Sequence, residues 1–241
     1  MRPLVVIPAL NEERSVGTVV AATRGLGFDV CVIDDGSTDA TGARAREAGA
    51  QVLRLPVNLG IGGALRCGFR WALANGYDAV VQVDADEQHD PSEITILLDA
   101  MRDTDAEMVI GSRFVAGAGT YEVHRARRVV MSALSRRVAR ITGVRVLDSS
   151  SGFRAIRRPL LDRFATDYPV EYLDSVEALV DAGRTGAKIV EQPVAMAPRE
   201  TGTPSSGTIS SVWHVLRVII AMELMHKRRP QGPASVPGAG D

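Results

Sequence analysis

Short apolar runs alternate with helical patterns along the first half of the chain. The runs are mostly apolar, which is typical of parallel strands buried on both faces. The predicted strands are residues 4–7, 30–33, 51–55, 79–83 and 108–110, and the predicted helices are residues 12–24, 39–48, 63–74 and 91–102. The pattern over residues 1–115 therefore predicts a doubly wound α/β sheet. Ligands of such sheets bind at the carboxyl ends of the strands.

The second half has a less regular pattern. Residues 121–145 carry seven arginines and one acid, Glu122, with the apolar residues on one helical face and most arginines opposite. This predicts an amphipathic helix that either faces a membrane or packs its apolar side on the core. A helix at 170–182, an edge strand at 188–194 and an apolar helix at 212–225 are also expected. The last of these is too short to cross a bilayer.

Length and charge narrow the classes of protein. At 241 residues, the chain suggests one domain over 1–226 with a disordered tail at 227–241. The net charge of -1 excludes a globally basic nucleic-acid binder. Two cysteines are too few for a disulfide framework, so reduced thiols and a cytoplasmic location are expected.

Two aspartates follow the fourth predicted strand directly. Asp84 and Asp86 bring negative charge to the edge of a buried sheet, which is unfavourable unless a cation compensates it. Gln88 adds a neutral oxygen nearby. This set suits Mg²⁺ or Mn²⁺ bound together with a substrate phosphate. Asp90 and Glu93, in contrast, are expected to serve as the cap and first turn of the following helix.

Three further polar clusters stand at predicted strand ends. They are residues 8–12, residues 34–39 and the glycine-rich residues 58–64. Asp39 is expected to cap a helix, whereas Asp34 and Asp35 exceed what capping requires and are candidates for binding a nucleobase or ribose. The glycine-rich segment fails the GxGxxG pattern at Leu65. Its glycines serve either a tight turn and close packing or close approach to a nucleotide.

Taken together, these motifs resemble a known family. PALNEE (8–13), DDGSTD (34–39), NLGIGGA (58–64) and DAD (84–86) are similar to motifs of the GT-A fold, family 2 glycosyltransferases. VIGSRF (109–114), DSSSGFRA (148–155) and KIVEQPVAMAPRETGTPSS (188–206) resemble the dolichol/polyprenyl-phosphate mannosyltransferase branch. The resemblance implies a Rossmann-like, mostly parallel sheet flanked by helices, with C-terminal amphipathic helices. It also implies that residues 1–115 form a nucleotide-sugar-binding half and residues 116–226 an acceptor-binding half.

The resemblance also implies roles for individual residues. Nucleotide-sugar binding would fall to Pro8, Ala9, Leu10, Asn11, Glu12, Ile33, Asp35, Gly62, Asp84, Ala85 and Asp86. The metal would be held by Asp84, Asp86 and Gln88, and the catalytic residues would be Asp86, Arg113, Asp148, Arg154 and Arg199. Ser151, Gly152 and Phe153 match the segment beside the acceptor. The sequence departs from the family pattern at Leu10, where tyrosine is usual, and after the Arg199 loop, where Ser205 and Ser206 replace the usual lysine.

The implied reaction is metal-dependent transfer of a sugar, with inversion, from a nucleoside-diphosphate sugar (GDP-mannose or a UDP-hexose) to a polyprenyl phosphate. The enzyme would then contact the inner face of the cell membrane peripherally, and it could form a homo-oligomer. A soluble glycosyltransferase acting on a hydroxyl acceptor and a non-catalytic nucleotide-sugar-binding relative are the alternatives. A hydroxyl acceptor requires a base, for which Asp148 is the candidate, whereas a lipid phosphate predicts indifference to Asp148→Asn.

Overall fold

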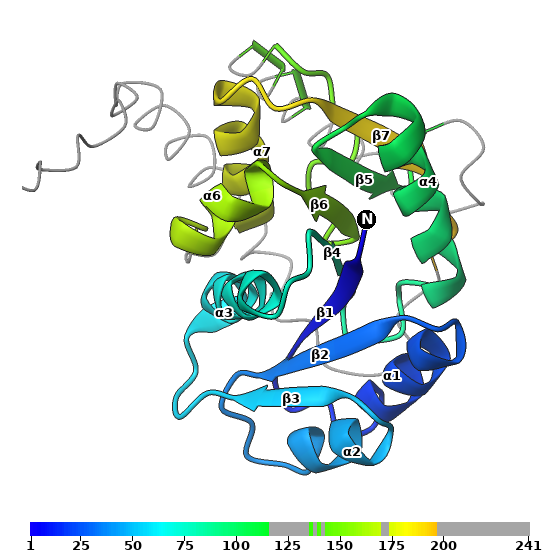
Figure 1. Ribbon diagram of the computed structural model, residues 1–241, viewed down its shortest axis with the longest axis vertical. Coiled ribbons are helices and arrows are strands. Elements are labelled where there is room, and N and C mark those ends of the chain that lie inside the picture. The colour runs from blue at the N-terminus through cyan, green and yellow to red at the C-terminus, as the bar shows by residue number, and fades with distance from the viewer. Residues whose placement is uncertain (116–134, 137–138, 141–142, 170–173, 197–241) are drawn as a thin grey trace, which may run out of the picture. The chain divides into compact units, whose positions relative to one another are not determined.

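A single sheet organises the protein. The computed structural model describes residues 1–115, 135–136, 139–140, 143–169 and 174–196 (Figure 1). Their strands are β1 (Pro3–Ala9), β2 (Asp29–Asp34), β3 (Gln51–Arg54), β4 (Ala79–Gln82), β5 (Met108–Ser112), β6 (Arg154–Arg157) and β7 (Ile189–Pro193). Their helices are α1 (Val16–Gly25), α2 (Thr41–Glu47), α3 (Gly60–Ala74), the short 3₁₀ turn η1 (Pro91–Glu93), α4 (Ile94–Thr104), α6 (Leu160–Thr166) and α7 (Asp174–Arg184).

The strands follow the order β3-β2-β1-β4-β6-β5-β7. β6 runs antiparallel to β4 and to β5, and the other neighbouring pairs are parallel. The prediction of a mostly parallel α/β sheet is therefore confirmed. The carboxyl ends of β1, β2 and β4 meet at one edge of the sheet, where the predicted polar clusters lie.

β6 and α6 are corrections to the sequence-based prediction, which assigned neither. β6 inserts between β4 and β5, so the sheet combines strands from residues 1–115 with strands from the second half of the chain. The sequence of β6, RAIR, is only four residues long and begins with an arginine that is wholly buried. A charged residue in a central strand is unfavourable by pattern alone, because its burial requires partners that only the tertiary structure supplies.

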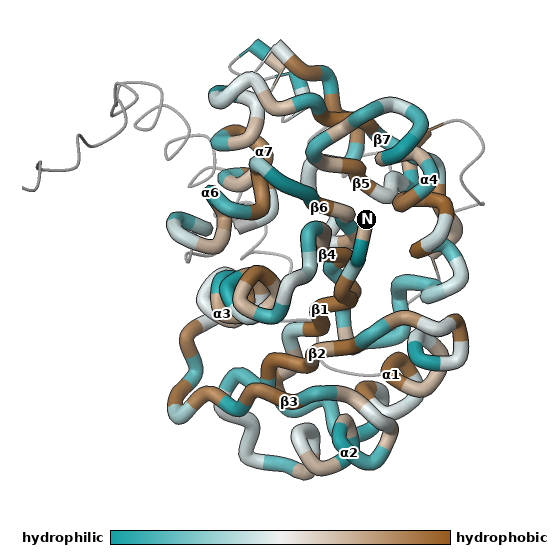
Figure 2. Tube along the Cα trace, in the orientation of Figure 1, coloured by the Kyte–Doolittle hydropathy of each residue, from teal (hydrophilic) through white to brown (hydrophobic). Residues whose placement is uncertain are grey.

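Helices cover both faces of the sheet. Figure 1 shows α3, α6 and α7 on one side of the strands and α1 and α4 on the other. Val5 and Val30 pack with Leu97 of α4 in one apolar cluster. On the other face, a methyl group on Gly68 of α3 would lie 2.6 Å from Val6, so glycine lets α3 approach the sheet closely. Figure 2 shows the resulting concentration of hydrophobic residues along the central strands.

Several predicted elements differ in extent or lie outside the described residues. α1 begins at Val16 because residues 12–15 form a turn in which the Ser15 amide donates to the carbonyl oxygen of Glu12 (3.2 Å). Most of the predicted helix at 121–145, and all of the segments at 212–225 and 227–241, lie outside the described residues. Among the helices that are described, none is long and apolar enough to cross a membrane.

Both cysteines are free thiols, as expected. Cys31 is buried in β2, and Cys67 of α3 is partly buried. Burial, together with the neighbouring Cys67, raises the pKa of Cys31 to about 12. Because the thiolate is the reactive form, Cys31 is an inert core residue at neutral pH.

Candidate active site

The turns after β1 and β2 are joined by hydrogen bonds. The amide of Asn11 donates to Oγ of Ser37 (3.0 Å), and the amide of Thr38 donates to Oδ1 of Asn11 (2.9 Å). Asn11 adopts a positive φ of 56°, a conformation that asparagine tolerates better than most residues. Asp34 accepts a hydrogen bond from the Ser37 amide (2.9 Å). These polar side chains therefore fix the shape of the two loops before any ligand binds.

Asp35 connects β2 to the glycine-rich segment. Its Oδ1 accepts a hydrogen bond from the amide of Leu59 (2.7 Å). Burial raises the pKa of Asp35, although the amides of Leu59 and Gly60 partly offset this effect. Gly36 has a φ of +78°, and a side chain there would lie 2.9 Å from the backbone nitrogen of Asn58. Glycine at position 36 is thus required both by the turn and by this close contact.

The other residues predicted to bind the nucleotide occupy varied environments. Pro8 and Ala9 are buried at the end of β1, whereas Leu10 beyond them is exposed. Gly62 is buried in the first turn of α3. Ile33 is wholly buried and packs against α3, so it is a core residue and does not line an open base pocket. That expectation for Ile33 is corrected, because its place in β2 turns its side chain toward the helix.

Asp39 and Asp90 each accept a hydrogen bond at the start of a helix. Asp39 accepts a hydrogen bond from the Thr41 amide (2.9 Å) at the start of α2, but the N-cap position of this helix is Ala40, one residue beyond the predicted cap. Asp90 accepts from the Ser92 amide (2.9 Å) at the start of η1, as predicted. The amide of Glu12 donates to Oγ1 of Thr41 (2.8 Å). The turn after β1 therefore rests on the first residue of α2.

The loop after β4 carries the paired aspartates. Oδ1 of Asp84 is buried and has no hydrogen-bond partner among the described residues. Asp86 is buried and accepts a hydrogen bond from the Gln88 amide (3.2 Å). Glu87, between Asp86 and Gln88, adopts a positive φ of 64°, which bends the loop back on itself. An unpaired buried carboxylate oxygen is costly, which makes Asp84 a candidate for contact with a ligand.

Gly152 forms the wall behind Asp84. A methyl group on Gly152 would lie 3.0 Å and 3.2 Å from the two carboxylate oxygens of Asp84 and 3.2 Å from Nε2 of Gln82. Nε2 of Gln82 is a second buried polar atom with no hydrogen-bond partner in the described part of the chain. Two unpaired polar groups therefore meet beside a glycine whose missing side chain leaves them room.

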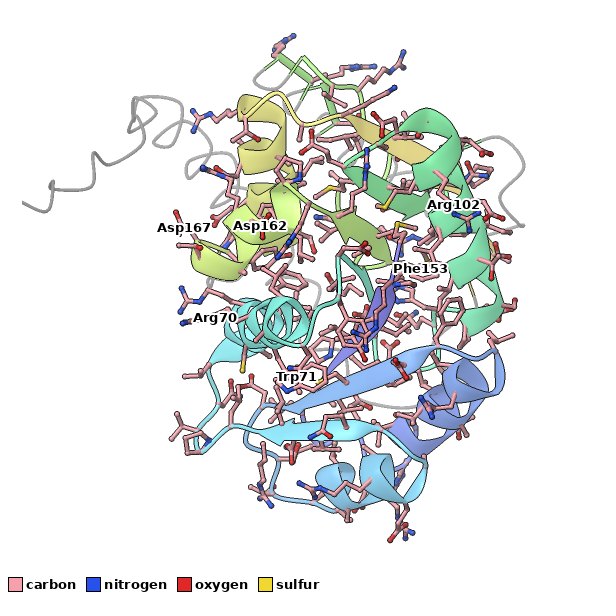
Figure 3. All side chains as sticks on the ribbon, in the orientation of Figure 1. Arg70, Trp71, Arg102, Phe153, Asp162 and Asp167 are labelled. Carbon is pink, nitrogen blue, oxygen red and sulfur yellow. The ribbon has the colours of Figure 1, made fainter. Side chains whose placement is uncertain are left out.

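His89 is a site residue that the sequence analysis missed. Its Nδ1 accepts a hydrogen bond from the Asp84 amide (3.0 Å), so the neutral ring carries its proton on Nε2, which lies 3.6 Å from Oδ2 of Asp84. The ring stacks on Phe153 with centroids 5.0 Å apart, and Figure 3 labels Phe153 among the strands. A β-bridge pairs His89 with Met196. The signal was a histidine within the same short segment as the two aspartates.

Arg113 and Asp148 form a two-point ion pair. Nε and Nη2 of Arg113 each donate to one carboxylate oxygen of Asp148 at 2.8 Å, and the Arg113 amide donates to Oδ2 at 3.2 Å. The Asp148 side chain is wholly buried, and that of Arg113 is 13% exposed. Asp148 is therefore not placed to act as a base, because its oxygens are enclosed and already accept hydrogen bonds. This corrects the role considered for it in a reaction with a hydroxyl acceptor.

Arg154 and Arg199 stand apart from these groups. Arg154 is wholly buried, and its guanidinium donates to the carbonyl oxygens of Ser151 (2.8 Å), Ser175 (2.7 Å) and Ser149 (3.0 Å). It holds the 148–152 loop from within the protein and is not exposed to a substrate. Arg199 lies outside the described residues.

A small cavity of about 100 Å³ is lined by residues from four separate segments of the chain. Its lining comes from the loop after β4, the residue after β5, the 148–152 loop and the residues after β7. These are Asp84, Gln88, His89, Arg113, Ser150, Ser151, Gly152 and Met196. The fold thus brings together the predicted metal ligands Asp84 and Gln88 and the predicted cation Arg113 from positions distant in sequence.

The donor set fits a hard divalent cation. The unpaired Oδ1 of Asp84 and the adjoining space at Gly152 provide a place for a ligand of this kind. Within the described ranges, no group of three or more histidine, cysteine or acidic side chains is arranged to hold a metal. Asp84 and Gln88 line the cavity, whereas Asp86 does not. The cavity itself therefore offers one carboxylate and one amide oxygen, and a Mg²⁺ or Mn²⁺ ion there would need substrate phosphates to complete its ligands.

Comparison with known proteins agrees with this architecture. Residues 4–164 match the model of the glycosyl transferase family 2, and the chain belongs to that family. It is 35% identical to polyprenol monophosphomannose synthase of Mycolicibacterium smegmatis over 213 residues, covering 83% of this chain and 79% of that protein. It is also 35% identical to undecaprenyl-phosphate mannosyltransferase of Micrococcus luteus, covering 84% of this chain and 86% of that protein. The protein is a glycosyltransferase.

Solved structures support the same fold. Glucosyl-3-phosphoglycerate synthase from Mycobacterium tuberculosis, in complex with Mn²⁺, UDP and glucosyl-3-phosphoglycerate, superposes with a TM-score of 0.68 at 25% identity, covering 95% of this chain and 81% of that chain. The same enzyme with Mg²⁺ and UDP also has a TM-score of 0.68, at 26% identity, covering 95% of this chain and 80% of that chain. The protein therefore has the predicted GT-A fold.

Proposed function

We propose that the protein transfers a sugar, with inversion, from a nucleoside-diphosphate sugar to a polyprenyl phosphate. One observation carries the acceptor class. The cavity presents Arg113 beside the loop after β4, while Asp148, the carboxylate nearest to Arg113, is enclosed by its ion pair. This arrangement favours an acceptor that arrives as an anion and needs no base. The names of the mannosyltransferase relatives point to the same acceptor class.

The donor would bind along the edge formed by β1, β2 and β4. The preformed turns at Asn11 and Asp35 would hold the nucleoside, with Asp35 as a hydrogen-bond acceptor. Asp84, Asp86 and Gln88 would hold Mg²⁺ or Mn²⁺ together with the diphosphate. When bound, the metal supplies positive charge that stabilises the departing diphosphate. His89 and Gly152 keep the carboxylate of Asp84 in place for this task.

The acceptor phosphate would lie against Arg113. A lipid phosphate is already anionic at neutral pH, so one of its oxygens forms the new bond to the anomeric carbon without prior loss of a proton. The bond from that carbon to the diphosphate oxygen breaks, and its electron pair leaves with the diphosphate. Arg113 orients the attacking phosphate, and Asp148 keeps the guanidinium in a fixed plane. A lipid acceptor also places the enzyme peripherally at a membrane surface.

A second acceptor class is supported by the solved structures. Their complexes contain phosphoglyceric acid or its glucosylated product, a small phosphorylated molecule. Arg113 would recognise the phosphate of such an acceptor as well. Sensitivity to Asp148→Asn does not separate the two acceptors, because the substitution disturbs Arg113 in either case. Direct transfer assays are therefore needed.

The first experiment tests the donor site. Thermal unfolding is followed with GDP, UDP, dTDP and CDP, each with and without Mn²⁺. A ligand at 100 times its dissociation constant stabilises the folded state by about 2.7 kcal/mol. We expect one diphosphate to stabilise the protein only with metal, and Asp86→Ala to abolish the effect. The exposed Asp103 of α4 provides the matched control, Asp103→Ala, which should leave the effect intact.

Sugar transfer is then measured with the donor so identified. The acceptors are undecaprenyl phosphate in detergent and 3-phosphoglycerate in solution. Transfer to the lipid alone supports the proposal, and transfer to 3-phosphoglycerate alone replaces it with the second acceptor class. Metal-dependent binding without transfer to either contradicts both and leaves a nucleotide-sugar-binding relative.

A further inference from the structure

Glu191 holds the loop that carries Asp148. This residue lies in the middle of β7, paired with Ile110 of β5. Its Oε2 accepts a hydrogen bond from the amide of Leu147 and its Oε1 accepts one from the amide of Asp148, both at 2.7 Å. Two consecutive backbone amides therefore bind one carboxylate. Such charge-assisted hydrogen bonds are stronger than neutral ones and fix the orientation of both peptide groups.

The next contact along the chain reaches the cavity. Asp148, whose amide Glu191 binds, accepts the two side-chain hydrogen bonds from Arg113. Nη2 of Arg113 also donates to Oγ of Ser150 (3.3 Å) in the same loop. The loop is thus held by Glu191 at its start and presents its side chains to Arg113 directly afterwards. An arginine that lines the cavity takes its orientation from a glutamate that does not.

From these contacts we infer that Glu191 is a positioning residue for Arg113. It acts through the Leu147 and Asp148 amides at the start of the loop, while Arg154 separately holds the Ser149 and Ser151 carbonyl oxygens nearer Gly152, so the effect of Glu191 falls on the acceptor side of the site. This inference rests on the proposed function in so far as Arg113 is assigned to the acceptor. The sequence carries a signal for it: an acid stands in the middle of the strand IVEQP, and acids are depleted in strands.

The test measures the exchange of protons with solvent, so it does not depend on enzyme activity. Arginine-labelled and uniformly ¹⁵N-labelled protein report the exchange with solvent of the Arg113 Nε proton and of the Leu147 and Asp148 amide protons. In Glu191→Ala we expect all three to exchange at least tenfold faster. In Glu191→Gln one oxygen remains, so one of the two amides should stay protected while the other loses protection. Unchanged exchange of the Arg113 proton in both variants overturns the inference.

A matched control comes from the other end of the same strand pair. Glu107, also partly buried, directly precedes β5, and its amide donates to the carbonyl oxygen of Lys188 (2.9 Å). Glu107→Gln removes the same charge and should leave the three exchange rates within twofold of the wild type. If Glu191→Ala does not fold, the test rests on Glu191→Gln, in which only one of the two amide protons should lose its protection from exchange.

Kinetics separate this inference from the proposed function. With Glu191→Gln, we expect the KM for the lipid phosphate to rise at least fivefold while the donor KM and the metal-dependent thermal shift stay within twofold. Equal increases in both KM values would overturn the assignment to the acceptor side. If the wild type transfers no sugar to a lipid phosphate and the exchange rates still change, the proposed function fails and the positioning of Arg113 by Glu191 stands.

Discussion

The α-carbon of Gly152 lies so close to the carboxylate of Asp84 that an added methyl group would be 3.0 Å from one oxygen and 3.2 Å from the other. Gly152 is not among the glycines with positive φ, so the nearby carboxylate, and not a left-handed backbone, is the reason for glycine at this position. The contact crosses the sheet edge, from the loop before β6 to the loop after β4. A residue that carries no functional group thereby determines where a candidate metal ligand sits.

Gly152→Ala should weaken metal-dependent nucleotide binding by about tenfold, comparable to the loss of a residue that supports a metal ligand. The methyl group pushes Asp84 from its position, while the fold loses little stability because a carboxylate can rotate. Titration calorimetry with the nucleoside diphosphate and Mn²⁺ measures the effect. The control is Gly17→Ala in α1, where the nearest atom would be 3.9 Å away. Equal affinities in the two variants would contradict the proposed role of Gly152.

His89→Ala should reduce Mn²⁺ affinity by about 10- to 100-fold, the range typical of residues that support metal ligands. The substitution removes the acceptor for the Asp84 amide and the ring beside its carboxylate. His89→Asn should recover part of the affinity, because its Oδ1 can replace Nδ1 as the acceptor. Mn²⁺ binding is measured by electron paramagnetic resonance. If asparagine and alanine lose equal affinity, the amide contact is not what positions Asp84.

Asp148→Asn should destabilise the protein by about 3–5 kcal/mol, since it leaves the mostly buried guanidinium of Arg113 without its charged partner. Chemical denaturation measures the change. Asp162→Asn removes an acid from a surface pair with Arg158 and should cost less than about 1 kcal/mol. A difference of less than 1 kcal/mol between the two variants would mean that the buried pair adds no stability.

Arg154→Lys should lower stability by about 2–4 kcal/mol, because an ammonium group cannot reach all three carbonyl oxygens that the guanidinium satisfies. Arg102→Lys on the exposed side of α4 is the matched control, and Figure 3 labels Arg102 there. Thermal unfolding of the two variants tests this. Loss of transfer with unchanged stability in Arg154→Lys would instead return Arg154 to a direct role in the reaction.

Asp35→Asn should raise the stability of the ligand-free protein at neutral pH while weakening nucleotide binding. Burial raises the pKa of Asp35, so its charged form is disfavoured in the folded state. The folded state therefore takes up this proton more readily than the unfolded state does, and the unfavourable contribution disappears as the pH falls through the raised pKa. The stability gain of Asp35→Asn should shrink in the same direction. A gain that grows on acidification would contradict this account.

The sequence determined most of the fold and the location of the site. Short, mostly apolar runs favour buried strands, and their alternation with helical patterns permits few topologies. Polar residues placed at the ends of such strands necessarily meet at one edge of the sheet. Asp34, Asp35, Asp84 and Asp86 could therefore be assigned to a common edge without coordinates.

Tertiary structure decided what those patterns could not. The sequence pattern did not predict β6, because Arg154 is stable in a central strand only when carbonyl oxygens from two other segments surround its guanidinium. The fate of Asp148 depended on Arg113, which is 35 residues away, and on Glu191, which is 43 residues away. A sequence does not show whether a carboxylate is a base or a buried ion-pair partner. Its chemistry is set by burial and by neighbours, and these arise only when distant segments fold together.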